Sequence, residues 1–311
     1  MDPLLARKGI NTGAVTFVIP YVFFTPSGAL AAHIHRDVED LLIPQPTVLV
    51  TGSWLTVKEQ MPDRYAAELA ARGFTAVTFD FSGFGESPGT PGQAELPARK
   101  IAEITAVADA LTTCSFTAGR IGQLAVCASA QYTLGALSRG APIAAYVSVA
   151  GWFHDTATVA PFYGGEDGVR LRLERARDAL DTYRTSGQVE TVPAYEQDDE
   201  RAAMFLPLPY YATADRGAIP AWRNEMAELS WLYWLTFDGL TGAESVATPS
   251  LFVHSDDCVL PDNVRSLASR MPSADLIWGD GAQIDFYDQG PQVTFAVEAA
   301  ERHFRTHLTA L

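Results

Sequence analysis

The sequence feature that most constrains the fold of this chain is residues 120–130, where an apolar strand runs directly into small residues and then into a helix. Residues 121–126 have the continuous apolar character of a buried strand, and residues 131–138 follow a helical pattern. Cys127 and three further small residues stand between them. A tight strand-to-helix turn of this kind lifts one side chain above the edge of a sheet. The pattern therefore predicts an exposed, reactive side chain at the end of a central strand.

Cys127 is the side chain that this turn favours. The turn is crowded, so the residues two positions before and two positions after the raised one must be small, and Ala125 and Ser129 meet that condition. If Ser129 were raised instead, the flanking residues would be Cys127 and Gln131, and Gln131 is too large. The alternative interpretation is that Cys127 is a small buried hydrophobic residue, because free cysteine is among the most buried residue types.

Strands and helices alternate along most of the chain, which predicts a mostly parallel sheet with right-handed crossovers and helices on its faces. The expected strands are residues 47–50, 74–79, 121–126, 143–149, 249–254 and 276–278, and the expected helices are residues 62–72, 97–111, 131–138 and 291–307. Ahead of them, residues 21–33 have the pattern of a hairpin, with a turn at residues 26–28.

The alternation stops between residues 152 and 245. This segment is rich in tryptophan and tyrosine, and its acidic run at residues 196–200 has the character of a solvated loop. We interpret the segment as an inserted helical cap, whose aromatic side chains form a small core of their own or face a pocket. The expected organisation is a core domain in residues 1–151, the cap in residues 152–245, and the rest of the core in residues 246–311.

Composition excludes several classes of function. The chain has 311 residues, of which 48% are apolar, enough for one large α/β sheet with an insertion. Its formal net charge of −15 repels phosphate backbones, so we expect no nucleic-acid partner. No apolar run is long enough to span a membrane. Pro20 interrupts the apolar run of residues 13–24, so this region is expected to be the hairpin and not a secretory signal.

Cysteine usage indicates a reducing compartment. Three cysteines, Cys114, Cys127 and Cys258, are too few for a disulfide framework, and an odd number cannot all pair within one chain. We therefore expect a cytoplasmic protein. No cluster of cysteine and histidine has the spacing of a zinc site, and we expect no metal or other cofactor. The expected partner is a small-molecule substrate and not a membrane. The sequence leaves the number of subunits open, a homodimer included.

The order of these parts resembles the α/β-hydrolase fold. Residues 80–87 resemble the family's aspartate–glycine–glycine–serine loop, with Ser82 where arginine is frequent, and residues 51–54 match the loop whose backbone N–H groups help to form the oxyanion hole. Cys127 matches the nucleophile position, with cysteine in place of the usual serine, as in bacterial dienelactone-hydrolase-like members. The resemblance covers roughly residues 47–150 and 247–307, and it implies an α/β-hydrolase fold with an inserted cap.

The resemblance also implies a nucleophile, an acid and a histidine, in that chain order. Asp257 lies four residues before Pro261, the spacing usual for the family's acid, and the neighbouring Asp256 is the alternative. Either residue is otherwise an ordinary turn residue. The histidine position, just after the last strand, holds Gln283, and glutamine cannot take up a proton.

Two features bear on the missing histidine. A thiol is already partly ionised at neutral pH, and a helix N-terminus such as the one after Cys127 is expected to lower its pKa further. His154, at the carboxyl end of a strand, is the best placed substitute for the base, and His254 is a second candidate. Both histidines also have a purely structural interpretation, because a single histidine near a strand end is weak support for catalysis.

Two functions follow from these residues. The first is an enzyme acting on a small ester, thioester or lactone, with Cys127 as nucleophile and with the backbone N–H groups of Ala128 and of Ser53 or Trp54 holding the oxyanion. The second is a protein that has kept the pocket but lost hydrolysis, and that binds a ligand or catalyses cyclisation or acyl transfer. Gln283 favours the second, and the turn, the oxyanion loop and the acid favour the first.

Overall fold

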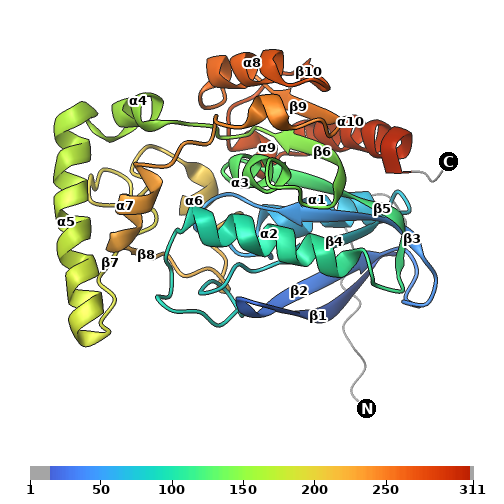
Figure 1. Cartoon of the computed structure of the whole chain (residues 1–311), viewed down its shortest axis with the longest axis horizontal. Helices are drawn as coiled ribbons and strands as arrows, with labels where there is room; N and C mark the ends of the chain where they lie inside the picture. The colour runs from blue at the N-terminus through green and yellow to red at the C-terminus, as the bar shows by residue number, and fades with distance from the viewer. Residues whose placement is uncertain (1–14, 309–311) are drawn as a thin grey trace.

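The structure is a computed structural model that describes residues 15–308, and it is built on one eight-stranded sheet (Figure 1). The strand order is β1-β2-β4-β3-β5-β6-β9-β10. The strands are β1 (Phe17–Thr25), β2 (Gly28–Arg36), β3 (Gln45–Thr51), β4 (Thr75–Phe79), β5 (Thr117–Val126), β6 (Ile143–Val149), β9 (Ser250–His254) and β10 (Ala274–Trp278). The six strands from β4 to β10 along this order are parallel, as the alternating sequence pattern predicts.

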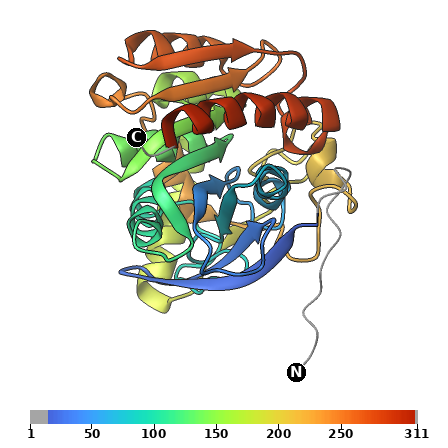
Figure 2. The same cartoon turned by 90° about the vertical axis from the view of Figure 1, so that its right-hand side faces the viewer.

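Helices cover both faces of this sheet. α1 (Met61–Ala70) packs against α10 (Gly290–Leu308) on one face, and α2 (Pro97–Leu111) packs against α3 (Ser129–Leu137) on the other (Figure 2). α8 (Pro261–Arg270) follows β9 and packs against β10. Covering a parallel sheet on both faces explains why its central strands are continuous apolar runs. The predicted α/β-hydrolase architecture is confirmed in this order of strands and helices.

The N-terminal hairpin is longer than predicted. β1 and β2 pair antiparallel along their whole length, from Phe17 opposite Arg36 to Thr25 opposite Gly28. Gly28 has φ +119°, a conformation that a turn residue with a Cβ rarely adopts. β2 then pairs antiparallel with β4, so the hairpin is an extension of the main sheet. The first part of the apolar run considered as a secretory signal, residues 13 and 14, lies outside the described residues.

The segment from 152 to 245 lies outside the eight-stranded sheet and is less helical than predicted. Its one long helix is α5 (Gly165–Ser186). The other elements are short: α4 (Thr156–Val159), η1 (Ala160–Tyr163), β7 (Thr191–Val192), α6 (Pro209–Ala212), β8 (Met226–Ala227), η2 (Glu228–Ser230), α7 (Trp231–Trp234) and η3 (Ala243–Ser245). Four prolines between residues 193 and 220 explain the irregular part, because proline removes a backbone donor and interrupts helices.

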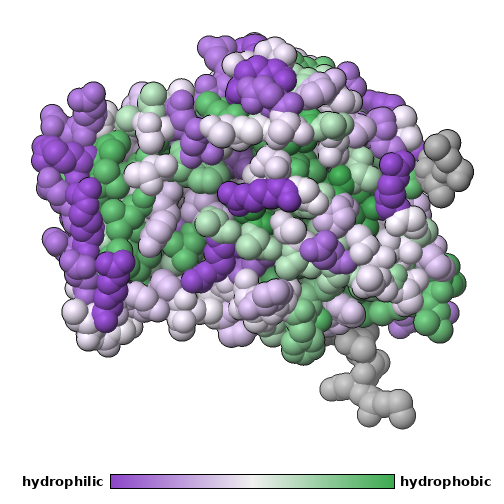
Figure 3. Space-filling view, in the orientation of Figure 1, coloured by the Kyte–Doolittle hydropathy of each residue, from purple (hydrophilic) through white to green (hydrophobic). Residues whose placement is uncertain are grey.

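α5 packs through one face on the other elements of the segment 152–245. Arg172, Ala176 and Ala179 are buried at helical spacing, and the guanidinium carbon of Arg172 lies 5.3 Å from the ring centre of Trp231. In Figure 3, hydrophilic side chains gather along the edge of the molecule that α5 occupies. The helix therefore separates solvent from the aromatic side chains behind it. Across residues 15–308, no helix has both the length and the apolar character of a membrane span.

Candidate active site

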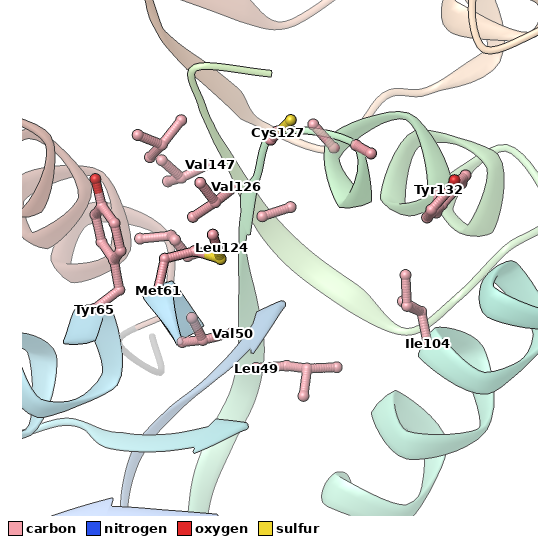
Figure 4. Close-up of a cluster of buried hydrophobic side chains, with 14 of the residues drawn as sticks. Leu49, Val50, Met61, Tyr65, Ile104, Leu124, Val126, Cys127, Tyr132 and Val147 are labelled. Carbon is pink, nitrogen blue, oxygen red and sulfur yellow. The ribbon is translucent and has the colours of Figure 1, made fainter. Parts of the chain in front are cut away.

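The turn after β5 holds Cys127 in a strained backbone conformation. Cys127 has φ +57°, in the left-handed region that residues with a Cβ seldom occupy. Its N–H donates to Val149 O at 3.1 Å, and its own carbonyl accepts from Ala130 N and Trp152 N, both at 3.0 Å. Figure 4 shows Cys127 at the top of β5, where α3 begins. Three backbone bonds thus hold the strand-to-helix turn that the small residues around Cys127 predict.

The loop after β3 passes beside this turn. Gly52 is required there, because a Cβ on it would lie 2.7 Å from Pro62 Cγ. Ser53 and Trp54 both line the cavity that contains Cys127. The next residue, Leu55, has φ +59°, and its N–H donates to the Glu95 carboxylate at 3.1 Å. The Glu95 carboxylate, which is buried, therefore holds the backbone of the loop that is predicted to form the oxyanion hole.

Glu95 is the centre of a buried polar network that sequence reasoning missed. Besides Leu55 N–H, its carboxylate accepts from Lys100 Nζ at 2.8 Å and from the Tyr132 hydroxyl at 2.6 Å. The Lys100 ammonium also lies 4.5 Å from the ring centre of Phe84. Lys100 is five residues from Glu95, but Leu55 and Tyr132 come from distant segments, so no local pattern predicts the network.

Asp80 supports the far end of the same loop. Its carboxylate accepts from the backbone N–H of Lys58 at 2.8 Å and from the Lys58 ammonium at 2.8 Å. The N–H of Glu86 donates to it at 3.0 Å. The aspartate–glycine motif recognised in residues 80–87 thus has a structural task here: it anchors the loop that carries Ser53 and Trp54.

The cavity beside Cys127 has a volume of about 110 Å³ and is lined mostly by apolar side chains. Core residues form one side, and the segment 152–245 closes the other with Trp152, Phe162, Phe205 and Tyr211. Trp54 of the core stacks on Trp234 of that segment, with ring centres 4.3 Å apart. Among the described residues, no aspartate, glutamate, lysine, arginine or histidine lines this cavity.

The Cys127 thiol is buried, and burial raises its pKa above the usual value. Four polar groups act against burial and lower the pKa. In order of decreasing effect they are the Ser53 side chain, the Tyr287 side chain, the Ala128 N–H and the Gln283 side chain. Burial outweighs them, because an apolar wall cannot solvate a thiolate. The sequence-based expectation of an exposed thiol with a lowered pKa was therefore wrong, although four polar groups partly offset the effect of burial.

Gln283 occupies the position where a histidine was expected, next to Cys127. Its Nε2 donates to Ala150 O at 2.7 Å and to the Tyr287 hydroxyl oxygen at 3.3 Å. Its Oε1 accepts from Val259 N–H at 3.2 Å. The two backbone partners fix which end of the amide is oxygen and which is nitrogen. The side chain is thus held rigidly beside the sulfur and cannot act as a base.

The structure does not bring the predicted acid to this site. Asp256 and Asp257 are both exposed, and neither lines the cavity. Asp256 instead forms an ion pair with Arg265, which lowers the pKa of its carboxyl. The residue that contacts Gln283 from this turn is Val259, through its backbone. The turn residues predicted from the Asp257–Pro261 spacing therefore face solvent.

His154 and His254 also lie away from the cavity lining. His154 Nδ1 accepts from Trp152 Nε1 at 2.6 Å, and its Nε2 contacts Trp234 O at 2.9 Å. Both ring nitrogens are thus engaged, and burial lowers the pKa of His154 to about 4. His254 is buried against Trp278, with ring centres 5.2 Å apart, and burial likewise lowers its pKa to about 4. Neither histidine is placed to exchange a proton with Cys127.

Two tyrosines that sequence reasoning missed reach the sulfur's surroundings. Tyr211 and Tyr287 are buried and line the cavity, and burial raises the pKa of each phenol well above 10. Tyr287 had a local signal, because it lies four residues after Gln283, one helical turn along the chain. Tyr211 had none, since its approach to Cys127 depends on how the cap folds over the core.

A separate group of residues has the composition of a metal site. His33, His35 and Asp63 offer ligand atoms that lie within 4.8 Å of one another. In the structure, Asp63 accepts from His33 Nδ1 at 2.8 Å, from His35 Nε2 at 3.0 Å and from the Thr78 hydroxyl at 2.6 Å. These contacts already satisfy the carboxylate, so the group is explained as an ion-pair cluster joining α1 to β2 and β4.

The family model for the alpha/beta hydrolase family matches residues 47–293, a range that contains Ser53, Cys127 and Gln283. The chain belongs to the alpha/beta hydrolase family. Two bacterial proteins of unassigned function are similar to this chain in sequence. Uncharacterized protein YcjY of Escherichia coli is 46% identical over 81 residues, which is 26% of each protein. Uncharacterized protein PA2218 of Pseudomonas aeruginosa is 28% identical over 278 residues, 82% of this chain and 74% of that protein.

Solved structures show the same fold. The crystal structure of PA2218 is similar to this chain with a TM-score of 0.80 and 21% identity, and the match covers 94% of each chain. The enol-lactonase from Burkholderia xenovorans LB400 is similar with a TM-score of 0.62 and 12% identity, over 92% of this chain and all (100%) of that one. At such identities the likeness concerns the fold, and the chemistry has to be argued from the site.

Proposed function

We propose that this alpha/beta hydrolase attacks the carbonyl of a small, largely apolar ester, thioester or lactone through Cys127 and forms an acyl-cysteine. The observation that carries this proposal is the placement of the Cys127 thiol on a strained strand-to-helix turn, in contact with an apolar cavity. A side chain held in this way can reach a bound carbonyl carbon without reorganising. The apolar lining favours a substrate with an aliphatic acyl group over a charged substrate.

The oxyanion would be held by backbone N–H groups of the two loops that meet at Cys127. The N–H of Ala128, the residue that follows Cys127, is one of the groups that lower the pKa of the thiol. The N–H of Ser53 or Trp54 is the second donor in this proposal, because both residues line the cavity. Preorganised donors in an apolar site stabilise the negative charge that develops on the carbonyl oxygen. Their contribution is large because water is excluded.

Release of the acyl group distinguishes hydrolysis from acyl transfer. Hydrolysis needs a base for the attacking water, and none of the described residues lining the cavity is one at neutral pH. This specific observation favours the second candidate, in which the acyl group passes to a nucleophile other than water, such as a hydroxyl of the substrate itself. A thioester suits this site best as acyl donor, because a thiol replaces a thiol of similar acidity.

The test is direct observation of the acyl-enzyme. Native protein is mixed with p-nitrophenyl butyrate, and both the p-nitrophenol burst and the mass of the protein are recorded. The proposal expects one burst equivalent and one butyryl group on the peptide that contains Cys127. C127A should give neither. C114S serves as the matched control, since Cys114 does not line the cavity, and it should behave like native protein. A native protein without adduct and without burst would overturn the proposal.

The same experiment decides between the two fates. Slow decay of the adduct in water, together with rapid decay when a small alcohol or thiol is added, supports acyl transfer. Rapid decay in water alone supports hydrolysis and requires a proton acceptor from outside the cavity lining.

A further inference from the structure

Several hydroxyl-bearing residues line the cavity as described, and Tyr287 is the one whose hydroxyl is hydrogen-bonded to Gln283. It lies on α9 (Asp285–Asp288) and is buried. Its ring packs edge-on against Tyr210, with ring centres 5.2 Å apart. Its hydroxyl is one of the four groups that lower the pKa of the Cys127 thiol.

The bonds of Gln283 determine which way the Tyr287 proton points. Gln283 Oε1 is engaged by Val259 N–H, so its Nε2 is the atom facing Tyr287, at 3.3 Å. An amide nitrogen can only donate, and the Tyr287 oxygen therefore accepts. A phenol that accepts from one side directs its own O–H elsewhere. The remaining polar neighbours of this O–H are the Cys127 sulfur and the hydroxyl groups of Ser53 and Tyr211, and a bound substrate would lie among them.

The phenol also keeps its proton. Burial and the neighbouring Cys127 raise its pKa well above 10, so Tyr287 is a proton donor throughout the physiological range and never a free base. A donor of this kind can act only if it regains a proton in the same step. The thiol of Cys127 supplies one, since its own pKa is raised by burial and it enters the reaction protonated.

We propose that Tyr287 is a catalytic residue that carries the thiol proton of Cys127 to the leaving group. This proposal rests on the proposed acyl-cysteine chemistry. As the Sγ–carbon bond forms and the bond from carbon to the leaving atom breaks, the Sγ proton moves to the Tyr287 oxygen. The Tyr287 proton moves to the leaving oxygen or sulfur. Tyr287 ends as it began, no charge is left in the apolar cavity, and no further reactant is needed.

Gln283 has a defined task in this scheme. It cannot carry a proton, but its Nε2 holds the Tyr287 oxygen in place and its backbone contacts hold the amide. Gln283 is thus a positioning residue. A histidine at residue 283 would transfer the proton itself. In this scheme Tyr287, four residues further along the chain, does so instead.

The experiment compares leaving groups. Acylation is followed by single-turnover mass spectrometry with p-nitrophenyl butyrate, whose leaving group departs as an anion, and with S-ethyl thiobutyrate, whose leaving group must be protonated. For Y287F we expect acylation by the thioester to fall about 10²-fold or more, within the range for a lost proton donor. Acylation by the p-nitrophenyl ester should fall by a clearly smaller factor, because that ester needs Tyr287 only to take up the thiol proton. A merely structural role would slow both substrates alike.

Y65F is the matched control. Tyr65 is also buried, and its hydroxyl donates at 2.6 Å to Phe286 O, on the same short helix as Tyr287. It does not line the cavity, so we expect Y65F to acylate like native protein with both substrates. Equal acylation of Y287F and native protein by the thioester would overturn the proposal, and so would an equal loss with both substrates.

A second readout does not depend on any substrate. The rate of Cys127 alkylation by iodoacetamide against pH gives the thiol pKa, and loss of the Tyr287 O–H should raise that pKa in Y287F but not in Y65F. If native protein forms no acyl-enzyme at all, the proposed function fails, and this titration still decides whether Tyr287 donates to the sulfur. An unchanged thiol pKa in Y287F would overturn the proposal.

Discussion

Gln283 accepts a hydrogen bond from the backbone N–H of Val259 at 3.2 Å, in a turn whose two carboxylates, Asp256 and Asp257, both face solvent. A histidine at residue 283 would therefore meet a backbone donor where a catalytic histidine usually finds an acid. The site therefore lacks two of the three parts of a hydrolytic triad, because it has no histidine at residue 283 and no carboxylate beside that residue.

Replacing Gln283 by histidine should restore only part of hydrolysis. Q283H introduces a base near the acyl-cysteine, but no carboxylate orients its ring. We expect deacylation in water to accelerate by about 10-fold, well short of the roughly 10²–10⁴-fold of a fully supported base. Decay of the butyryl adduct measures this, with Q283N as the control that adds no base. If Q283H reaches the full enhancement, a carboxylate must move into the site.

The reactivity of Cys127 should increase steeply with pH. Burial raises the thiol pKa above its usual value, so the thiolate fraction is small at pH 7 and continues to grow beyond pH 9. The check is the rate of Cys127 labelling by iodoacetamide between pH 7 and 10, followed by peptide mass mapping. A rate that levels off below pH 8 would show that the four polar groups outweigh burial. Cys258, whose pKa burial raises to about 11, should label more slowly.

Acyl chain length should control acylation. The cavity wall is apolar, and each buried methylene is worth about 0.8 kcal/mol, roughly 4-fold in binding. We expect kcat/KM for acylation to rise from p-nitrophenyl acetate to butyrate and then to stop rising as the cavity fills. F205A should move the optimum to a longer chain, because Phe205 lines the cavity from the cap side. A profile that is flat with chain length in native protein would argue against the cavity as the acyl site.

His154 should affect stability and not catalysis. The pKa of His154 is about 4 in the folded state and about 6.5 in the unfolded state. The folded protein therefore holds His154 in its neutral form, and protonation favours unfolding. That stabilisation is complete above pH 6.5 and is lost as the pH falls toward 4, by about 3 kcal/mol. Urea unfolding at pH 6.5, 5.5 and 4.5 should show a shallower pH dependence for H154Q than for native protein. A large loss of Cys127 acylation in H154Q at pH 7.5, in protein that remains folded, would instead make His154 part of the reaction.

Glu95 and Lys100 should be strongly coupled. E95Q leaves the buried Lys100 ammonium without its carboxylate and should lower the free energy of unfolding by about 3–5 kcal/mol. E95Q/K100M removes both charges and should regain much of that loss, as urea unfolding of the single and double variants can show. Losses that simply add in the double variant would mean that the pair contributes no coupling.

Local patterns predicted the parts of the site that are built from adjacent residues. The turn at Cys127 and the loop at Ser53 and Trp54 are formed by short segments whose small residues and strand ends are visible in sequence. The raised pKa of Cys127 could not be predicted, because it depends on a cap that closes over the thiol from distant residues. The same holds for Tyr211. Asp257 had the expected spacing, but the direction of a turn side chain is decided by its surroundings.

The stacked pair Trp54 and Trp234 links the loop after β3 to the segment 152–245, with ring centres 4.3 Å apart. One indole belongs to the part of the molecule that would stabilise the reacting oxygen, and the other to the part that covers it. Any motion that separates the two rings must change their near-ultraviolet circular dichroism and their fluorescence. Ligand entry that moves these rings can therefore be followed by the circular dichroism or fluorescence of the unlabelled protein.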